Sequence, residues 1–450
     1  MRENGIYIET FGCQMNVADT ERAATGLHRA GYHLTDKIEE AEIVLFNTCS
    51  VRARAEQKVF TRVGALRQGE KKPMLGIMGC VAQLEGGTLF ESAPDISFVA
   101  GTRATDRLAS LIERVRAGER RVIDLGERQL GEGWDVSPVE RHSPHVALVP
   151  IIEGCNKFCT YCIVPYSRGR EQSRPATEIL EELSRLHARG YKEVHLIGQN
   201  VNSYRPKSDA GLLGFAGATP FARLLRAVAA TGIPRIKFIT SFPRDFHPDI
   251  VQAMDEHENL CNWIHLPVQT GSDRVLRAMR RGYKVADYLA RVETIRKARR
   301  RYALTSDIIV GFPGETVEDF EATQRLVKTC QFDSIYIFKY SARPNTPAAK
   351  LSDDVSDNEK KARFLALEGL QSEIQAKKLA AYVGQRVSVL VEGESARSSS
   401  DVTGHTTCNK VINFPGDKSL VGEIVNVKVL EVKAHSLYGE ACRGRLAVSS

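Results

Sequence analysis

The interpretation of the centre of this chain depends on one stretch of sequence, Glu153-Gly-Cys155-Asn-Lys-Phe-Cys159-Thr-Tyr-Cys162. It places three cysteines at C-x3-C-x2-C spacing, directly after an apolar run at 146–152 that predicts a strand. Three thiolates within eight residues of one loop can bind three corners of a cubic iron–sulfur cluster. No fourth cysteine follows nearby, so such a cluster would keep one iron open for another ligand. The alternatives are a three-cysteine zinc site or coincidence. Structural zinc sites usually have paired C-x2-C motifs and a fourth ligand.

The cysteine loop follows the first of six predicted strands that alternate with helical segments. These strands are predicted at 146–152, 193–197, 236–240, 263–268, 305–310 and 335–340, and a long helix at 357–381 closes the region. This alternation predicts a partial (β/α)6 barrel over residues 145–376. In such barrels the chemistry lies at the carboxyl ends of the strands.

The first part of the chain, residues 1–118, predicts an open parallel α/β sheet. Apolar runs at 6–11, 43–46, 74–78 and 96–100 alternate with helical segments at 20–30, 53–66 and 103–116. Cys13, Cys49 and Cys80 each follow a predicted strand by one to three residues. Because parallel strands end at one edge of the sheet, these three cysteines are expected to converge. Each one alone would be interpreted as a small buried side chain, as Cys261, Cys330, Cys408 and Cys442 are.

Two further segments complete the predicted organisation. Residues 119–144 are polar and rich in Gly, Glu and Arg, which is typical of a linker. Residues 377–447 change period, with alternating strands at 386–391 and 423–432 and no helical stretch between them. This last segment predicts a small antiparallel β-barrel.

Composition limits the class of protein. The chain has 450 residues, 42% hydrophobic and 26% charged, which excludes a largely disordered protein. Its net charge of +7 permits a polyanionic partner without requiring one. No apolar run reaches the roughly 18 residues of a membrane span, and the first residues lack a signal-peptide core. We therefore expect a cytoplasmic, monomeric protein with no membrane contact.

The cysteine loop resembles the signature of the radical S-adenosylmethionine (SAM) superfamily, C-x3-C-x-aromatic-C, with Tyr161 as the aromatic residue. The resemblance implies a [4Fe-4S] cluster on Cys155, Cys159 and Cys162 whose open iron binds the amino and carboxylate groups of SAM. It also implies reductive cleavage of SAM to a 5′-deoxyadenosyl radical, which the protein shields from water and directs.

Over residues 5–446 the chain resembles the methylthiotransferase family within that superfamily. The N-terminal motifs that carry this resemblance are Phe11-Gly-Cys-Gln-Met-Asn, Asn47-Thr-Cys-Ser-Val-Arg and Gly79-Cys-Val-Ala-Gln. Further matching segments are Pro165-Tyr-Ser-Arg-Gly-Arg, Gly198-Gln-Asn-Val-Asn-Ser-Tyr, Leu266-Pro-Val-Gln-Thr-Gly-Ser, Asp307-Ile-Ile-Val-Gly-Phe-Pro-Gly-Glu-Thr and Phe338-Lys-Tyr-Ser-Ala-Arg-Pro-Asn-Thr-Pro-Ala. The resemblance implies that Cys13, Cys49 and Cys80 hold a second [4Fe-4S] cluster, which delivers the sulfur.

The resemblance also implies a substrate. The C-terminal segment is similar to the TRAM domain, a small RNA-binding barrel, and single-stranded anticodon-loop bases are reachable by a sunken active site. Gly12-Cys-Gln-Met-Asn, Cys49-Ser-Val-Arg and Arg281-Gly-Tyr match the subgroup that methylthiolates C2 of N6-dimethylallyladenosine at position 37 of tRNA. Related subgroups act on threonylcarbamoyladenosine in tRNA or on an aspartate of a ribosomal protein. A non-catalytic iron–sulfur RNA-binding protein and a two-cluster electron carrier are the alternatives outside this enzyme class.

Candidate SAM contacts follow from the barrel interpretation. Gln199, Gln269 and Asp307 lie at or just beyond predicted strand ends, where their polar groups can contact SAM or satisfy loop backbone. The expected partners are tRNA, an electron donor such as flavodoxin or ferredoxin, and iron–sulfur assembly or carrier proteins.

Overall fold

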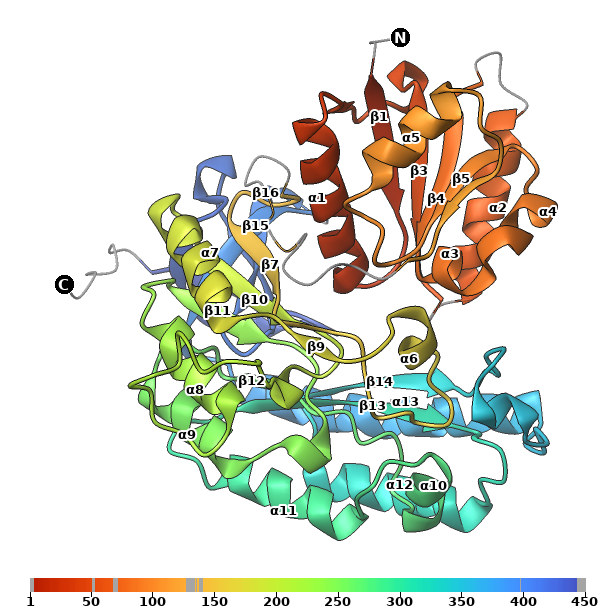
Figure 1. The fold of residues 1–450 in the computed structure, drawn as a ribbon. Coiled ribbons are helices and arrows are strands. Elements are labelled where there is room, and N and C mark those ends of the chain that lie inside the picture. The colour runs from red at the N-terminus through yellow and green to blue at the C-terminus, as the bar shows by residue number, and fades with distance from the viewer. Residues whose placement is uncertain are drawn as a thin grey trace. The chain divides into compact units, whose positions relative to one another are not determined.

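The computed structural model describes residues 4–50, 53–67, 72–126, 134, 136, 141–396 and 398–442 (Figure 1). Contacts divide the chain into two units. The first unit contains Met1–Lys157, Cys162–Arg174 and Ile197–Gln199, and the second contains Phe158–Tyr161, Pro175–Leu196 and Asn200–Ser450. No helix in the described part of the chain is long and apolar enough to cross a membrane.

The first unit is built on a parallel sheet with the strand order β2-β1-β3-β4-β5-β6. Its strands are β1 (Gly5–Thr10), β2 (His33–Leu34), β3 (Ile43–Thr48), β4 (Met74–Gly79), β5 (Ile96–Ala100) and β6 (Val122–Asp124). The helices are α1 (Gln14–Arg29), α2 (Ala53–Arg67), α3 (Cys80–Glu85), α4 (Leu89–Ser92) and α5 (Leu108–Arg116), and they cover the sheet in Figure 1. Successive residues of β3 enter two separate apolar cores, Ile43 and Leu45 on one face and Val44 and Phe46 on the other. This explains why β3 is an unbroken apolar run.

The sequence predicted the four longer strands of this sheet to within two residues of each end and missed the two short ones. β2 and β6 have two and three residues, too few to show a period. β6 lies inside the segment predicted as a linker, 119–144, so that segment begins with the edge strand of the sheet. Residues 127–133, 135 and 137–140 of the predicted linker lie outside the described residues. The first predicted helix, 20–30, begins earlier, at Gln14, and the third, 103–116, begins later, at Leu108.

The central region confirms the predicted alternation of strands and helices. Its strands are β7 (Val146–Pro150), β10 (Glu193–Ile197), β11 (Arg235–Phe238), β12 (Trp263–His265), β13 (Ala303–Val310) and β14 (Ser334–Lys339), with a short antiparallel pair of β8 (Ile152–Glu153) and β9 (Gln172–Ser173). The helices are α6 (Val164–Ser167), α7 (Ala176–Ala188), α8 (Pro220–Ala229), α9 (Pro248–Glu256), α10 (Asp273–Ala278), α11 (Val285–Arg296), α12 (Val317–Cys330) and α13 (Asp357–Ala380). In the second unit β10 pairs with β11, and β12, β13 and β14 form a parallel sheet.

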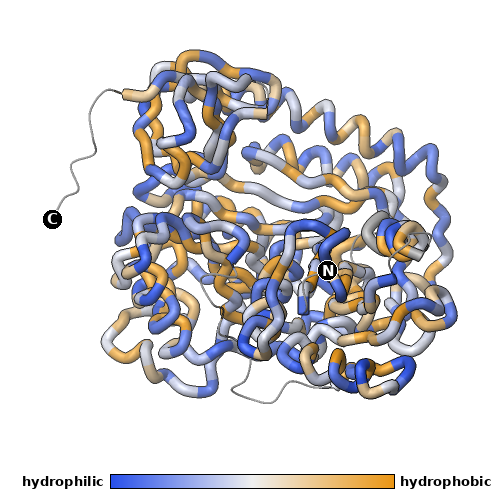
Figure 2. Tube along the Cα trace, turned by 90° about the horizontal axis from the view of Figure 1, so that it is seen from above, coloured by the Kyte–Doolittle hydropathy of each residue, from blue (hydrophilic) through white to orange (hydrophobic). Residues whose placement is uncertain are grey.

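The C-terminal segment forms the predicted small barrel, closed in the order β15-β16-β17-β19-β18. Its strand pairs are antiparallel as predicted, except that β17 and β19 are parallel. Its strands are β15 (Arg386–Ser395), β16 (Ser398–Thr406), β17 (Val411–Pro415), β18 (Ile424–Val432) and β19 (Leu437–Ala441). Buried residues alternate with more exposed ones along β16 and β17, and Figure 2 shows hydrophobic and hydrophilic residues interspersed toward the C-terminal end of the chain. The inward residues, among them Val389, Val402 and Phe414, make one apolar core.

Buried ion pairs fasten this barrel to the amino ends of the central strands. Glu193 at the start of β10 pairs with Arg235 at 2.8 Å and with Lys237 at 2.9 Å. These two cations continue to the barrel, where Arg235 donates to the His405 carbonyl at 3.0 Å and Lys237 to Asn409 Oδ1 at 3.3 Å. Burial alone would raise the pKa of Glu193, but Lys237, His195 and Arg235 outweigh burial and hold it below its ordinary value.

A second buried group acts at the same junction. Asp333, just ahead of β14, pairs with Lys378 of α13 at 2.7 Å and with Lys410 of the barrel at 3.3 Å. Its carboxylate also accepts from the Leu304 main-chain nitrogen at 3.1 Å. The barrel is therefore fixed by charges that water does not screen.

We predict that Glu193→Gln strongly destabilises the protein, by about 3–5 kcal/mol, because it leaves Arg235 and Lys237 buried without their carboxylate. The measurement is the free energy of unfolding from a urea titration at pH 7. The matched control is Glu293→Gln, which removes a largely exposed carboxylate from its pair with Lys297 and should leave the free energy of unfolding almost unchanged. Equal losses in the two variants would contradict the assigned role of the buried cluster.

Candidate active site

Three cysteines from separate parts of the chain converge at the carboxyl edge of the N-terminal sheet. Cys13 caps α1 after β1, Cys49 follows β3, and Cys80 begins α3 directly after β4. These three strands are neighbours in the sheet. The Cys13 thiol is hydrogen-bonded to Cys49, which lowers the pKa of Cys13 to about 6, and Cys13 and Cys80 interact electrostatically. The predicted convergence is therefore present, whereas the role of these thiols as cluster ligands stays a prediction.

The donor set at this edge fits an iron–sulfur cluster. Three thiols gather there, and the loops that carry them approach closely at Gly12 and Gly79. Across the described ranges, no three His, Cys, Asp or Glu side chains are arranged to hold a single metal ion. A [4Fe-4S] cluster presents a different iron to each thiolate, so its ligands need not meet at one ion.

Two glycines permit the loops to approach one another. Gly12 has φ +136°, and a Cβ on it would lie 2.5 Å from the Cys49 Cβ. Gly79 has φ +96°, and a Cβ there would collide with Asn47 Oδ1 and lie 2.7 Å from the Thr48 carbonyl oxygen. Both positions therefore require glycine for conformation and for space.

Two buried amides fix the same loops, and the sequence analysis did not single them out. Asn16 Nδ2 donates to Asn47 Oδ1 and to the Thr48 carbonyl, both at 3.0 Å, and Asn47 Nδ2 donates back to the Asn16 carbonyl at 2.7 Å. Cys13 Sγ donates to Asn16 Oδ1 at 3.2 Å. The only signal was their presence within the cysteine motifs, which did not distinguish them from other motif residues.

A buried arginine, Arg168, connects this edge to the strand that leads into the C-x3-C-x2-C loop. Its side chain is 3% exposed and pairs with Asp19 of α1 at 2.6 Å and with Glu153 of β8 at 3.3 Å. The same guanidinium acts electrostatically on Cys13 and Cys80, lowering the pKa of each thiol, although burial leaves the pKa of Cys80 raised. Arg168 thus places positive charge beside Cys13 and Cys80.

Two of the three cysteines of the C-x3-C-x2-C loop are buried. Cys155 and Cys159 are each 7% exposed, and Cys162 is partly buried. In the first unit, the Cys155 nitrogen donates to the Gly169 carbonyl at 3.1 Å. In the second unit, Thr160 donates from its main-chain nitrogen to the Met279 carbonyl at 3.1 Å. The loop is therefore held by main-chain bonds from both sides of Cys159.

The predicted SAM contacts fall into two places. In the second unit Gln269, with φ +80°, donates its main-chain nitrogen to the Asp307 carbonyl at 2.9 Å, so the structure brings these two residues together. Asp307 lies inside β13 (Ala303–Val310), and not at or beyond a strand end as predicted. Its Oδ1 lies 3.0 Å from His265 Nε2, a neighbour that the sequence analysis missed.

Gln199 belongs to the first unit, directly after β10. Its buried Oε1 has no hydrogen-bond partner among the described residues. A buried acceptor without a donor is what a bound polar ligand would satisfy. Contact of Gln199, Gln269 and Asp307 with SAM stays a prediction.

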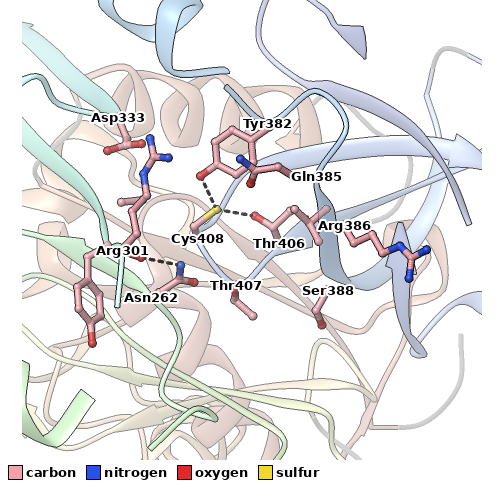
Figure 3. Close-up of a pocket in the computed structure, with 13 residues that line it drawn as sticks. Asn262, Arg301, Asp333, Tyr382, Gln385, Arg386, Ser388, Thr406, Thr407 and Cys408 are labelled. Carbon is pink, nitrogen blue, oxygen red and sulfur yellow. Dashed lines mark hydrogen bonds between the residues drawn. The ribbon is translucent and has the colours of Figure 1, made fainter. Parts of the chain in front are cut away.

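A cavity of about 250 Å³ lies at the opposite end of the central strands from Gln269 (Figure 3). It is lined by residues that precede β12, β13 and β14 and by the start of the barrel, including Asn262, Tyr302 and Asp333. At its centre Cys408 Sγ is hydrogen-bonded to Tyr382 Oη and to Thr406 Oγ1, each at 3.1 Å. It contains none of the predicted site residues.

Comparison with family models divides the chain into three matching segments. Residues 149–327 match the Radical SAM superfamily, residues 5–101 match Uncharacterized protein family UPF0004, and residues 380–442 match the TRAM domain. A solved radical SAM methyltransferase, TsrM from Kitasatospora setae, is similar in fold, with a TM-score of 0.56 at 14% identity over 77% of this chain and 75% of that one.

Full-length relatives share a single name, tRNA-2-methylthio-N(6)-dimethylallyladenosine synthase. The relative from Solibacter usitatus (strain Ellin6076) is 45% identical over 442 residues, 97% of each chain. The one from Koribacter versatilis (strain Ellin345) is 42% identical over 441 residues, again 97% of each chain, and the one from Actinobacillus pleuropneumoniae serotype 3 (strain JL03) is 41% identical over 97% of this chain and 92% of that one. At this identity and coverage, the chain belongs to the tRNA-2-methylthio-N(6)-dimethylallyladenosine synthase family of radical SAM enzymes.

Proposed function

We propose that this protein methylthiolates C2 of N6-dimethylallyladenosine at position 37 of tRNA. The observation that carries the proposal is the convergence of Cys13, Cys49 and Cys80 in a chain that also has the C-x3-C-x2-C loop. The names of its full-length relatives support the same activity. The C2–H bond of adenine is not acidic, so its replacement calls for radical chemistry rather than proton abstraction.

Membership of the radical SAM superfamily implies one [4Fe-4S] cluster and SAM. We assign that cluster to Cys155, Cys159 and Cys162, a second to Cys13, Cys49 and Cys80, and SAM contacts to Gln199, Gln269 and Asp307. When bound, the clusters and SAM supply the electron, the radical, the methyl group and the sulfur of the reaction.

The chain's own residues bind, orient and shield these groups. Burial of Cys155 and Cys159 limits the access of water to these two residues. The main-chain hydrogen bond from the Gln269 nitrogen to the Asp307 carbonyl keeps these two proposed SAM contacts on neighbouring segments. At the N-terminal edge, Asn16 and Asn47 fix the cysteine loops, so that the thiols keep one arrangement.

The closed barrel β15–β19 is the proposed RNA-binding module. From Lys377 to Ser450 the chain has ten Lys and Arg against seven Asp and Glu, a net +3 that is suited to a phosphate backbone. We further propose that the anticodon loop is the part of tRNA recognised, that flavodoxin or ferredoxin supplies electrons, that iron–sulfur carriers load the clusters, and that the protein works as a cytoplasmic monomer. The domains proposed are 1–118, 145–376 and 377–447.

The first test separates the two cysteine sets. The reconstituted protein should contain about eight irons per chain, falling by half when Cys155, Cys159 and Cys162 are replaced by Ala. Replacing Cys13, Cys49 and Cys80 instead should also halve the iron, leave reductive SAM cleavage measurable and abolish methylthiolation. Zinc in place of iron, or methylthiolation by the variant without the N-terminal cysteines, would defeat the assignment.

The second test uses a glycine. Gly12→Ala should lower occupancy of the N-terminal cluster while leaving the loop cluster intact, because its new Cβ would collide with Cys49. Gly31→Ala is the matched control: Gly31 also has a positive φ, +88°, but a Cβ there meets nothing within 4 Å. Iron analysis together with cluster spectra gives the result. A comparable loss in both variants would mean that backbone strain, rather than the approach of the loops, is responsible.

The third test concerns the substrate. A pocket that buries the five carbons of the dimethylallyl group gains about 0.8 kcal/mol per methylene, so omission of the group should reduce turnover by orders of magnitude. The measurement is mass spectrometry of nucleosides from tRNA incubated with enzyme, SAM and reductant, with and without prior dimethylallylation. Equal product on unmodified tRNA, or product only on threonylcarbamoyladenosine or a ribosomal protein, would reject this substrate and leave the family membership intact.

A further inference from the structure

Arg281 is a buried arginine that contacts the C-x3-C-x2-C loop. Arg281 is 5% exposed and lies shortly after α10 in the second unit. One guanidinium nitrogen, Nη1, lies 3.4 Å from Cys159 Sγ and 3.4 Å from Tyr161 Oη. The other two nitrogens donate to Tyr283 Oη at 3.1 Å and to the Pro267 carbonyl at 2.8 Å.

The charge of Arg281 has no carboxylate partner in the described part of the chain. Other buried arginines do: Arg168 pairs with Asp19, and Arg363 pairs with Glu315 at 2.7 Å. Arg281 instead meets phenols, a carbonyl and the face of the Phe242 ring, whose centroid is 4.5 Å away. Dipoles and a ring face compensate a buried cation only in part, so an anion is missing from this site.

The backbone around Arg281 is shaped to turn this side chain inward. Arg280 has φ +55° and Gly282 has φ +70°, so two left-handed residues flank it. Arg280 is exposed, whereas Arg281 is buried. A left-handed conformation at a non-glycine residue costs free energy, and it persists here because the neighbouring contacts determine it.

We infer that Arg281 is an electrostatic partner of the loop cluster, which compensates the Cys159 thiolate and raises the cluster's reduction potential. The inference rests on the proposed cluster at Cys155, Cys159 and Cys162. As a cluster ligand, Cys159 is a thiolate, which supplies the anion that Arg281 lacks. An N–H donor and a positive charge beside the sulfur favour the reduced, more negative cluster over the oxidised one. Arg281 therefore eases the one-electron reduction on which SAM cleavage depends.

Arg244 provides a matched control. Its guanidinium also lies over the Phe242 ring, with the carbon 5.4 Å from the centroid. Its side chain, however, is 51% exposed and pairs with Asp245 at 3.2 Å. Arg244→Gln thus removes a cation from the same ring without touching Cys159.

The experiment uses the full chain with Cys13, Cys49 and Cys80 replaced by Ala, so that only the loop cluster is present. Midpoint potentials are measured by redox titration followed by electron paramagnetic resonance in this parent and in its Arg281→Gln, Arg281→Lys and Arg244→Gln variants. Arg281→Gln should lower the equilibrium constant for reduction about tenfold, a shift of about 59 mV to more negative potential for one electron. Arg281→Lys should shift less, and Arg244→Gln should match the parent.

Thermal melting of the cluster-free proteins gives a second measurement that does not depend on loading. Without a thiolate partner the buried charge of Arg281 destabilises the folded protein. The melting temperature of cluster-free Arg281→Gln should therefore equal or exceed that of the cluster-free parent. Melting well below the parent would make Arg281 a structural residue and overturn the inference, as would equal potentials for Arg281→Gln and Arg244→Gln. A parent that binds no cluster would instead reject the proposed function.

Discussion

A guanidinium group beside cysteine sulfur is the interaction that the two cysteine sets share. A thiolate in a water-poor site is costly unless a cation or N–H donors face it, and the chain provides a different arginine for each set. Arg168 lies beside Cys13 and Cys80 and is itself balanced by Asp19 and Glu153. Arg281 faces Cys159 without any such balance in the described residues. The charge of Arg168 is therefore neutralised by carboxylates without any bound group. The charge of Arg281 is neutralised only when Cys159 is a thiolate.

Much of this architecture follows from rules that act along the chain. The long strands were predictable because buried parallel strands are continuous apolar runs, and the meeting of Cys13, Cys49 and Cys80 was predictable because parallel strands end at one edge. The short strands β2 and β6 were not predictable, since two or three residues carry no period. The residues that support the cysteine loops were not predictable either. The pattern of the sequence does not show which asparagine or arginine is buried, because burial depends on contacts between distant segments. Asn16 with Asn47, and Arg168 with Asp19, are such contacts.

In the second unit, different groups of residues lie at the carboxyl ends and at the amino ends of the central strands. The carboxyl side of β12 leads to Gln269, whose main-chain nitrogen donates to the Asp307 carbonyl of β13, and these two residues are the proposed SAM contacts of this unit. The amino ends carry Glu193, Arg235 and Asp333, whose buried ion pairs fasten the C-terminal barrel. Buried ion pairs contribute little net stability compared with apolar packing, but their geometry is specific, because each charge requires its partner in place. The barrel is therefore held in one orientation on these strands.

That orientation matters for an enzyme that must present one base of a large RNA to a reactive centre. If the barrel binds the RNA backbone, any freedom between barrel and strands would spread the positions of the target carbon, and a misplacement of about 1 Å can cost two orders of magnitude in rate. A flexible tether would increase binding through effective concentration but would not define position. The junction through Lys237–Asn409, Arg235–His405 and Lys410–Asp333 would instead make RNA binding at the proposed RNA-binding barrel fix the position of the RNA along β12–β14. On this proposal, the buried charges at the amino ends of the strands position the substrate for the groups proposed at the carboxyl ends.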